Sequence, residues 1–551
     1  MNAALQILME PAAQPDRYSR AWFDKQMVVA RSLDSVLQSR WKWNCTKKVK
    51  GYKGLFPEQG QMTAANAELR MSVSTLVRAD LNLASDDESL RDWSKAKARQ
   101  FETWVHDRCA PKSKALSMLQ PYGLSLPQVK KSGDKDEEYH RQVLRLCSVD
   151  WWLRQTRVLC QRHCEALLRD LGETRKHRGA YVSDHTLKRM LSHNYRNQQF
   201  LKYTEAENDL GQVFSLDELA ALGTSNPVLR RGELMLRIRG FQEWADRNPK
   251  QKWRGMFYTL TCPSKYHAWH SKGGKNAAFN SSTPLDGQRY LTKVWAQIRA
   301  CAARDGIPMF GFRVAEPHHD GTPHWHVLTF VPRARRKALT RIMRKYALNE
   351  DGAEPGAKKY RFEAVVIDPR RGGAAGYIAK YISKNIDGFA VDIDREVDAP
   401  AAIMAARVKA WSQVWGIRQF QQFGGPPVTV WREARRLASN PAQLPKEGQL
   451  PVLAEQIIDS ADRGLWAEFV ELMGGAVRRR ELRPMKSFYL FSQALGRYGE
   501  QVKRIKGVTV VGFLYPLVSR PRKWITRRIQ GARDWVAALV AASPPPLDLC
   551  Q

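Results

Sequence analysis

The sequence lacks several features that mark other classes of protein. It contains no apolar run of about 18 residues, so we do not expect a membrane-spanning helix. Its amino terminus has no basic segment ahead of an apolar stretch, so we do not expect a signal peptide. It contains no Gly-x-x-x-x-Gly-Lys-[Ser/Thr] phosphate loop, which argues against an ATP-driven motor within the chain. We therefore expect a cytoplasmic protein that uses no ATP.

Acidic residues are scarce. Asp and Glu number 55 against 89 Lys and Arg, which leaves a formal net charge of +34 and a pI of about 10.0. An excess of this size indicates a polyanionic partner, and nucleic acid is the leading one. An anionic membrane surface is the alternative, but no compact basic amphipathic helix dominates the sequence.

Cysteines are few and scattered, with eight in the whole chain. Cys160 and Cys164 flank His163, which would allow a zinc knuckle. The surrounding residues predict a helix, however, and the usual paired short spacings are missing. We therefore favour buried thiols in a protein of a reducing compartment.

One stretch carries a candidate metal site. Residues 309–316 and 323–331 are rich in apolar residues and predict two strands, joined by the turn-forming segment His-Asp-Gly-Thr-Pro. Side chains alternate along a strand, so His324 and His326 point to the same face. Glu316 ends the preceding strand, where a hairpin would bring its carboxylate beside the imidazoles. Two His nitrogens and one carboxylate form a three-ligand site with open positions. The alternative is two packed strand histidines.

A helix with two tyrosines is predicted about fifty residues later. Tyr377 and Tyr381 are four residues apart and therefore lie on one helix face. Lys380 and Lys384 each follow a tyrosine by three residues and share that face. Glycines at 372, 373 and 376 predict a loose start that would let the helix shift. The alternative is an ordinary amphipathic helix.

These motifs resemble a known family. Glu-Pro-His-His-Asp-Gly-Thr-Pro-His-Trp-His and Tyr-Ile-Ala-Lys-Tyr-Ile-Ser-Lys-Asn are similar to segments of the replication gene A proteins of temperate tailed phages. Those proteins belong to the two-tyrosine class of HUH endonucleases, which nick one DNA strand to start rolling-circle replication. Phe-Tyr-Thr-Leu-Thr-Cys-Pro-Ser at 257–264 resembles the first motif of that superfamily. The resemblance covers roughly residues 150–435.

The expected fold class is α+β. The chemistry-bearing segment predicts the order β-α-β-β-α-β-α, with an antiparallel sheet carrying the site. The resemblance implies a sheet of HUH endonuclease type. We expect a mainly helical, basic region at 1–230, the nicking domain at 231–390, and a basic, mixed region at 391–551 that binds DNA or a partner.

Two further segments are candidates for contact with DNA. Residues 266–284 are rich in Gly, Asn and Ser and predict a loop that could lie beside a strand. His267 and His270 lie in this segment, and His318 and His319 lie in the turn. Each could be a metal ligand, a proton carrier or an exposed residue. For the turn pair we favour exposed residues. A basic helix follows the second strand, and we predict a phosphate track there. Its residues are Arg333, Arg335, Arg336, Lys337, Arg341, Arg344 and Lys345.

The resemblance implies a mechanism. A tyrosine would attack the scissile phosphate while Mg²⁺ or Mn²⁺, bound by Glu316, His324 and His326, neutralises charge on the phosphate. Lys380 and Lys384 would stabilise the phenolate or the transition state. The products would be a 5′-phosphotyrosyl bond and a 3′-OH primer. Expected partners are single-stranded or supercoiled DNA at a replication origin, a host helicase and a host polymerase.

Two rival functions stay open. A two-tyrosine HUH transposase or relaxase would use the same chemistry, but would be expected to carry a joined helicase domain or a zinc ribbon, and neither is evident. A non-catalytic DNA-binding protein would use its histidines only for packing and would tolerate loss of both tyrosine hydroxyls.

Overall fold

A computed structural model describes residues 26–30, 33–46, 57–248, 251–389, 393–394, 397–445 and 450–529. The chain divides into two compact units, Met1–Leu171 with Ser492–Val502, and Gly172–Phe491 with Lys503–Gln551. The predicted ranges 1–230, 231–390 and 391–551 do not coincide with these units, and a division of functions along those ranges stays a prediction. The expectation about a signal peptide concerns residues outside the described ones.

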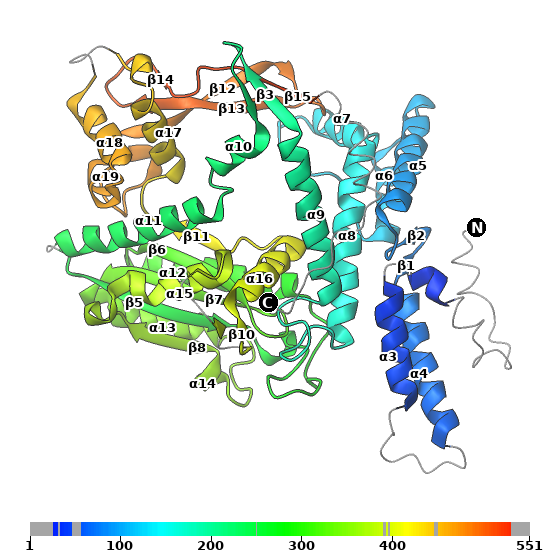
Figure 1. Ribbon diagram of the computed structural model, residues 1–551. Coiled ribbons are helices and arrows are strands. Elements are labelled where there is room, and N and C mark those ends of the chain that lie inside the picture. The colour runs from blue at the N-terminus through cyan, green and yellow to red at the C-terminus, as the bar shows by residue number, and fades with distance from the viewer. Residues whose placement is uncertain are drawn as a thin grey trace. The chain divides into compact units, whose positions relative to one another are not determined.

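The first unit is mainly helical in its described part (Figure 1). Cys160 and Cys164 are buried thiols on α8, and the Cys164 thiol donates to the Leu83 carbonyl (3.4 Å). This environment agrees with the preferred interpretation of these cysteines over a zinc knuckle. The elements of the unit are α3 (Asp34–Thr46), α4 (Pro57–Ser74), β1 (Val77–Arg78), β2 (Leu81–Asn82), α5 (Asp87–His106), α6 (Lys112–Leu119), α7 (Lys135–Leu146) and α8 (Val149–Asp170).

The second unit begins with helices whose ends follow from their capping residues. Asn226 accepts from the Val228 amide at the start of α11, and Pro follows it at the first helical position. Ser215 forms a capping box at the start of α10. The elements are α9 (Asp184–Lys202), β3 (Thr204–Asn208), β4 (Val213–Ser215), α10 (Leu216–Ala221) and α11 (Pro227–Arg247).

A five-stranded antiparallel sheet forms the centre of this unit, in the order β11-β6-β7-β5-β8. The fold is therefore α+β with antiparallel sheets, as predicted. The strands are β5 (Trp253–Thr261), β6 (Phe310–Pro317), β7 (Pro323–Pro332), β8 (Phe362–Val366) and β11 (Phe420–Phe423). Strands β6 and β7 lie close to the predicted ranges 309–316 and 323–331. β11 was not predicted as a strand, because its sequence Phe-Gln-Gln-Phe is too short and polar to give a strand pattern.

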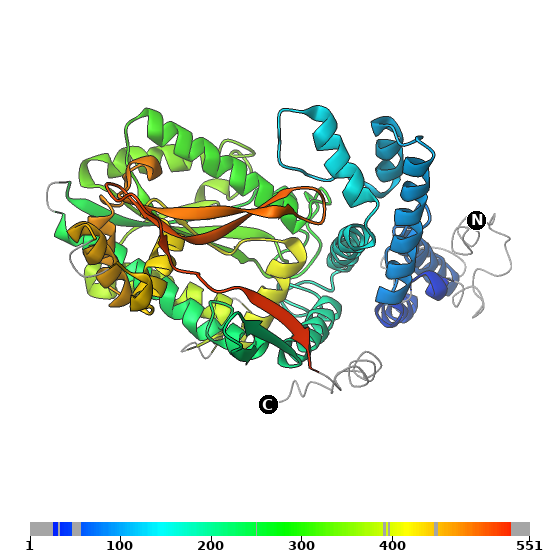
Figure 2. The ribbon, with the colours of Figure 1, turned by 90° about the horizontal axis from the view of Figure 1, so that it is seen from above.

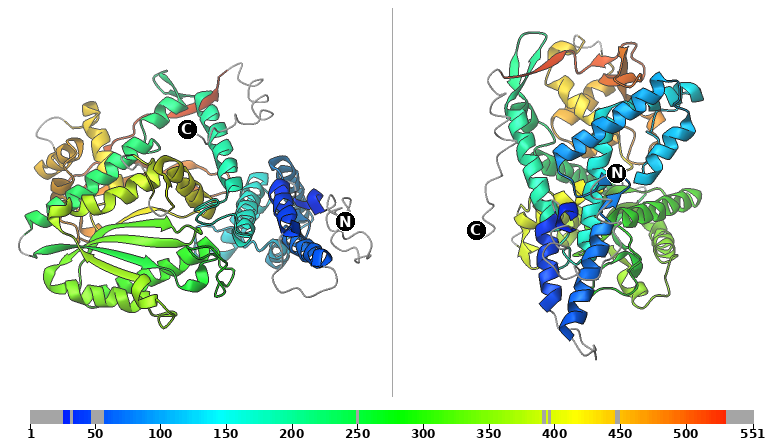
Figure 3. Two further views of the ribbon diagram at one scale, coloured as in Figure 1. Left: turned by 60° about the horizontal axis from the view of Figure 1, so that its bottom comes forward. Right: turned by 90° about the vertical axis from the view of Figure 1, so that its right-hand side faces the viewer.

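Different helices cover the two faces of the central sheet (Figure 3, left). Tyr258 on β5 hydrogen-bonds Thr340 on α13 (Arg336–Ala347), and Trp325 on β7 donates to Gln288 on α12 (Pro284–Arg304). Neighbouring strand residues point the other way. They pack into a hydrophobic core with α11, α15 (Gly373–Ile386), α17 (Val428–Ala438), α18 (Val452–Asp462) and α19 (Trp466–Leu472).

Smaller elements complete the second unit. β15 (Trp524–Arg528) pairs with β3, and β3 pairs with β4, so that a segment near residue 525 lies beside one near residue 206 (Figure 2). The remaining elements are α14 (Ala357–Tyr360), β9 (Ile393–Asp394), β10 (Ala399–Pro400), α16 (Ala401–Trp415) and β14 (Leu517–Val518). β12 (Met485–Leu495) and β13 (Gln501–Val510) belong to this unit except for the segment Ser492–Val502, which is counted with the first unit. None of the described helices combines the length and apolarity that crossing a membrane requires.

Candidate active site

Strands β6 and β7 bring the predicted carboxylate and imidazoles together. Glu316 lies directly opposite His324 in the strand register, and His326 lies two residues further along β7 on the same face. All three side chains are buried. One ligand atom from each lies within 4.8 Å of the others, and among the described residues these are the only three groups arranged in this way.

The donor set fits a single divalent cation. The Nε2 atoms of His324 and His326 are 3.0 Å apart, and the Glu316 Oε2 atom is 3.9 and 3.8 Å from them. Donors that share one ion at about 2.1 Å each are separated by roughly 3–4 Å. Burial, followed by the nearby His318, His326 and Lys384, holds the pKa of His324 well below its ordinary value, so its ring stays neutral and able to ligate. The three residues therefore have the geometry to bind a metal ion, and His324 is in the neutral form that ligation requires.

The tyrosine helix α15 lies on the same face of the sheet. The Tyr381 ring is 4.0 Å from the His326 ring, and both Tyr377 (6.1 Å) and Tyr381 (5.5 Å) contact Phe257 on β5. Ile378 and Ile382 turn into the core and fix the face that the tyrosines present. Tyr381 is thus placed next to the carboxylate–imidazole group, and Tyr377 lies one helical turn before it, against Phe257.

The Tyr381 hydroxyl is held in its neutral form. Burial, then the charges of Glu316 and Glu363, raise the pKa of Tyr381 above its ordinary value, while Lys384 acts in the opposite direction. Glu363 was not singled out from the sequence. It reaches the site because β8 pairs with β5 at the position opposite Thr259.

The two lysines predicted beside the tyrosines have different surroundings. Lys380 is exposed, and its Nζ atom lies 4.6 Å from the centre of the Tyr381 ring. Lys384 is mostly buried, with its Nζ atom 4.0 Å from Glu316 and 3.3 Å from Asp394. Lys380 therefore faces the phenol, and Lys384 links two carboxylates.

A shell of polar residues that sequence analysis did not select surrounds the three candidate ligands. Asn385 donates to Glu316 and to the Tyr381 carbonyl, and Gln419 donates to Asn385 (3.1 Å). Thr259 hydrogen-bonds the Nδ1 atom of His326 (3.3 Å). Asn385 could have been found, because it follows Tyr381 by four residues and shares its helix face. Gln419 reaches the site only through tertiary contacts.

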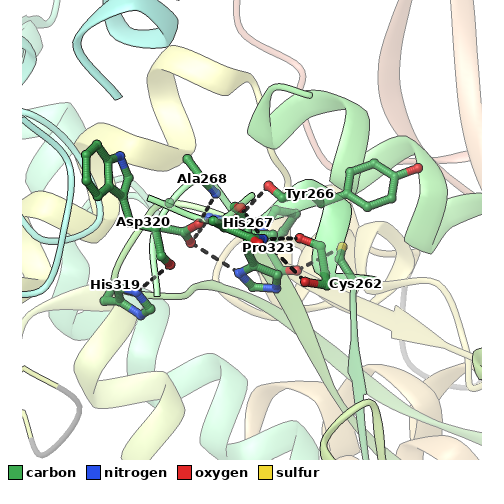
Figure 4. A network of polar contacts seen from close by, with 12 residues as sticks. Cys262, Tyr266, His267, Ala268, His319, Asp320 and Pro323 are labelled. Atoms are coloured by element: carbon green, nitrogen blue, oxygen red, sulfur yellow. Dashed lines mark hydrogen bonds and ion pairs between the residues drawn. The ribbon is translucent and has the colours of Figure 1, made fainter. Parts of the chain in front are cut away.

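The turn between β6 and β7 is more buried than expected. His319 is buried and within 3.1 Å of the Trp269 carbonyl, so the favoured interpretation of an exposed residue is wrong for it. His318 packs its ring 4.1 Å from the His324 ring. Asp320 causes this burial, because its carboxylate accepts from the Ala268 amide and ties the turn to the loop after β5 (Figure 4).

The predicted phosphate track lies elsewhere on the sheet. The basic residues of 333–345 belong to α13 and the turn before it, and α13 packs on the Tyr258 face rather than on the face of the three candidate ligands. Six of the seven cations are exposed and, within the described residues, form no ion pair with a carboxylate. Binding of DNA there stays a prediction, separate from the metal site.

The fold and site together define an α+β protein in which a helix with two tyrosines packs on an antiparallel sheet and places Tyr381 beside a carboxylate–imidazole group. The chain belongs to the bacteriophage replication gene A protein (GPA) family, whose model matches residues 67–389. This membership confirms the family resemblance of the motifs.

Several relatives support this assignment. The replication gene A protein of Escherichia phage 186 is 40% identical over 397 residues, which cover 71% of this chain and 56% of that protein. The replication gene A protein of Escherichia phage P2 is 36% identical, covering 69% and 51% respectively. A probable replication endonuclease from a Salmonella typhimurium prophage-like region is 32% identical, covering 79% and 55%. The chain thus spans about half the length of these relatives. No solved structure shows a significant match.

Proposed function

We propose that this chain is a site- and strand-specific DNA endonuclease that nicks a replication origin and rejoins the strands in rolling-circle DNA replication, with a sheet of HUH endonuclease type. Its relatives include replication gene A proteins and a probable replication endonuclease. The observation that carries the proposal is the contact of Tyr381 with His326 at 4.0 Å. A structural histidine pair would not need a half-buried tyrosine against it.

The reaction is a transesterification. The oxygen of a tyrosine hydroxyl forms a bond to phosphorus, the bond from phosphorus to the 3′ oxygen breaks, and the departing oxygen takes a proton to become a 3′-OH. The phenolic proton is lost in the same exchange. The 5′ end stays attached as a phosphotyrosine, and attack by a 3′-OH on that link rejoins a strand.

The surrounding residues prepare this exchange. Glu316, His324 and His326 are the proposed ligands of Mg²⁺ or Mn²⁺, which when bound supplies positive charge to a non-bridging phosphate oxygen. The charge of Lys384 lowers the pKa of Tyr381 and so favours the phenolate. Lys380, next to the ring, is placed to stabilise developing negative charge.

Two tyrosines on one helix face suit a cycle with two cleavages. One would keep the first 5′ end while the other cuts the regenerated origin. The freed 3′-OH is the substrate of a polymerase, so we propose a host polymerase and a host helicase as partners, and the host cytoplasm as the place of action.

The deciding experiment uses DNA that carries the origin of the replicon encoding the chain, labelled at the 3′ end of the nicked strand. With Mg²⁺ or Mn²⁺ the label should migrate with the protein on a denaturing gel, and EDTA should abolish this. The double variant Tyr377→Phe, Tyr381→Phe should give no adduct. Mass spectrometry of the adduct identifies the tyrosine that attacks first.

The matched control is Tyr346→Phe, which removes a tyrosine hydroxyl from α13 on the opposite face of the sheet. It should leave adduct formation unchanged. Tight binding of the origin DNA without any adduct, or an adduct that survives the double variant, would reject the tyrosine mechanism.

A further inference from the structure

A cavity of about 480 Å³ opens beside the candidate metal site. Its walls come from the loop after β5, the turn between β6 and β7, and residues 354–361. Four of the twelve histidines of the chain line it: His267, His270, His318 and His319. This volume is within the range of about 300–1,000 Å³ that small-molecule sites occupy.

The cavity walls are fixed by buried polar groups. The Asp320 carboxylate accepts from the Ala268 amide (2.8 Å) (Figure 4). It also accepts from the Thr322 amide and hydroxyl (both 3.0 Å). Asn276, also buried, donates to the carbonyls of Ser264 (2.9 Å) and His267 (2.8 Å). These hydrogen bonds anchor the first part of the loop predicted to lie beside DNA.

Strand β5 shows where the cavity lies relative to the tyrosines. Phe257 contacts both tyrosines, Thr259 hydrogen-bonds His326, and Thr261 lines the cavity. These residues are two apart and point to one face, with steps of about 7 Å. The tyrosines, the candidate metal ligands and the cavity therefore follow one another along the strand, with the ligands in the middle.

A row of neighbouring rings shows the same order of tyrosine, candidate metal ligands and cavity. The Tyr381 ring is next to that of His326, the two imidazoles of the metal group follow, and the His318 ring is 4.1 Å from His324. The His267 ring then lies 5.2 Å from His318. The cavity thus begins on the side of the metal group away from the tyrosine.

In phosphoryl transfer the attacking and leaving oxygens lie roughly in line on opposite sides of phosphorus. If a tyrosine attacks from the Phe257 side, the 3′ oxygen departs towards Thr261 and the cavity. We propose that the cavity binds the nucleotide on the 5′ side of the scissile phosphate, the one that leaves with the 3′-OH. This inference rests on the proposed function and adds the identity of a DNA subsite.

The cavity has the chemistry of a nucleobase pocket. Two planar rings line the cavity and can stack on a base. They are the exposed Tyr360, with Lys359 5.2 Å from its ring, and the partly buried Trp269, with Arg175 5.6 Å from its ring. The two Glu354 carboxylate oxygens accept from the Ser264 amide (3.1 and 3.2 Å), and one of them lies 3.6 Å from the Arg361 guanidinium. The carboxylate has further lone pairs for another donor. A carboxylate accepts from an exocyclic amino group such as that of cytosine, which thymine lacks. We therefore expect a base with an amino group at this position.

The first test measures binding without chemistry. After the nick is mapped by sequencing the adduct, fluorescent oligonucleotides that end with a 3′-OH at the nick are titrated with the full chain in EDTA. Replacing the terminal base by an abasic site should weaken binding about tenfold, the loss of one stacked base. An abasic site at the first position 3′ of the nick, in a longer oligonucleotide, should have a smaller effect.

Two variants assign the effect to the cavity. Tyr360→Ala should reduce the discrimination against the abasic end, and Tyr515→Ala should not; the two side chains are 69% and 68% exposed, so neither threatens folding. Glu354→Gln should reduce the preference for an amino-bearing base over thymine. Tyr360→Ala and Glu354→Gln can also be tested for nicking of oligonucleotides that carry the same base substitutions.

The outcomes separate the two proposals. A wild-type chain that forms no adduct with origin DNA contradicts the proposed function. Nicking and binding that ignore the base 5′ of the nick contradict the cavity inference alone. A dependence on the base 3′ of the nick that Tyr360→Ala removes would also overturn it, because the cavity would then hold the other nucleotide.

Discussion

Two carboxylates act on the Tyr381 hydroxyl: Glu316, which is a candidate metal ligand, and Glu363. Because burial, Glu316 and Glu363 raise its pKa, very little phenolate exists at neutral pH. Positive charge at the site, from Lys384 or from an ion bound to Glu316, would lower the pKa of Tyr381. The site is therefore expected to be weakly reactive until a cation is bound.

Glu363 offers a test of this electrostatic balance. Glu363→Gln removes one of the charges that raise the pKa of Tyr381, so the phenolate should form at lower pH. Glu363 is exposed, and the change should be less than about one pH unit because solvent screens it. The phenolate absorbance in a pH titration, compared with Tyr381→Phe to assign the signal, measures it. Glu468→Gln on α19, also exposed, should change nothing.

Asn385 positions Glu316 in the candidate metal site. It donates to Glu316 and receives a hydrogen bond from Gln419, so it fixes the direction of the carboxylate. Removing such a partner typically lowers metal affinity by about 10–100-fold. Asn385→Ala should show this loss for Mn²⁺ by calorimetric titration. The exposed Asn197→Ala should retain wild-type affinity, and equal affinities for both variants would show that Asn385 does not position Glu316.

At the scale of single elements, the start of α15 decides where the tyrosines lie. The glycines there were predicted to make the start loose, but the structure places Gly373 in a tight turn with φ of 59°. An added Cβ atom would lie 2.4 Å from the Gln242 Oε1 atom, which accepts from the Ala374 amide. Gly373 therefore allows α15 to dock closely on α11.

Gly373→Ala should lower the free energy of unfolding by about 1–3 kcal/mol, because it combines a left-handed backbone with a displaced hydrogen bond. Adduct formation should fall as well, since α15 carries both tyrosines. Gly232→Ala on α11 is the control: nothing lies within 4 Å of its added Cβ atom, and alanine there should stabilise the helix slightly. Denaturant unfolding of both variants is the measurement. Unchanged stability for Gly373→Ala would show that the turn relaxes freely.

The α17 helix is tied to the end of β14 by one buried carboxylate. Glu433 accepts from Ser519 (2.5 Å) and from Arg520 (2.7 Å), and it pairs with Arg436. Burial alone would raise the pKa of Glu433, but the hydrogen bonds from Arg520 and Ser519 and the charge of Arg436 outweigh it and lower the pKa. The ionised form is therefore the stabilising one.

The stability that Glu433 contributes should depend on pH. A carboxyl whose folded pKa is lowered contributes stability above its unfolded pKa of about 4.3, and this contribution is lost as the pH falls through the folded value. Glu433→Gln should cost about 1–3 kcal/mol at pH 7 and less at pH 3. Thermal unfolding at both pH values measures this. An equal loss at pH 7 and pH 3 would mean that charge is not involved.

At the scale of the whole molecule, the net charge of +34 is the dominant property. Binding of DNA should weaken steeply with salt because each neutralised phosphate releases counterions. If α13 follows the DNA backbone, the triple variant Arg335→Gln, Lys337→Gln, Arg341→Gln should reduce the slope of log affinity against log salt by about two to three.

The control removes the same number of charges elsewhere. Lys130→Gln, Lys131→Gln, Lys135→Gln changes three exposed lysines of the first unit and should have a smaller effect on the slope. Filter binding of single-stranded DNA from 50 to 300 mM salt would measure both variants. Equal slopes for the two triple variants would reject the predicted phosphate track on α13.

The sequence by itself determined the fold class, the strands and helices that carry the site, and the family. It also indicated Glu316, His324 and His326 as one group, because alternation along a strand and a short hairpin are local rules. Helix starts follow local rules as well: Asn226 and Thr283 cap α11 and α12 through contacts with the next few residues only.

Only the tertiary structure decided which faces meet. It placed α15 on the face of His326 and the basic α13 on the opposite one, although both helices are near in sequence. It also brought Asn385, Gln419 and Glu363 to the site and buried His319. These outcomes depend on which strands pair and which helix covers which face, and such contacts between distant segments leave no periodic signal in the sequence.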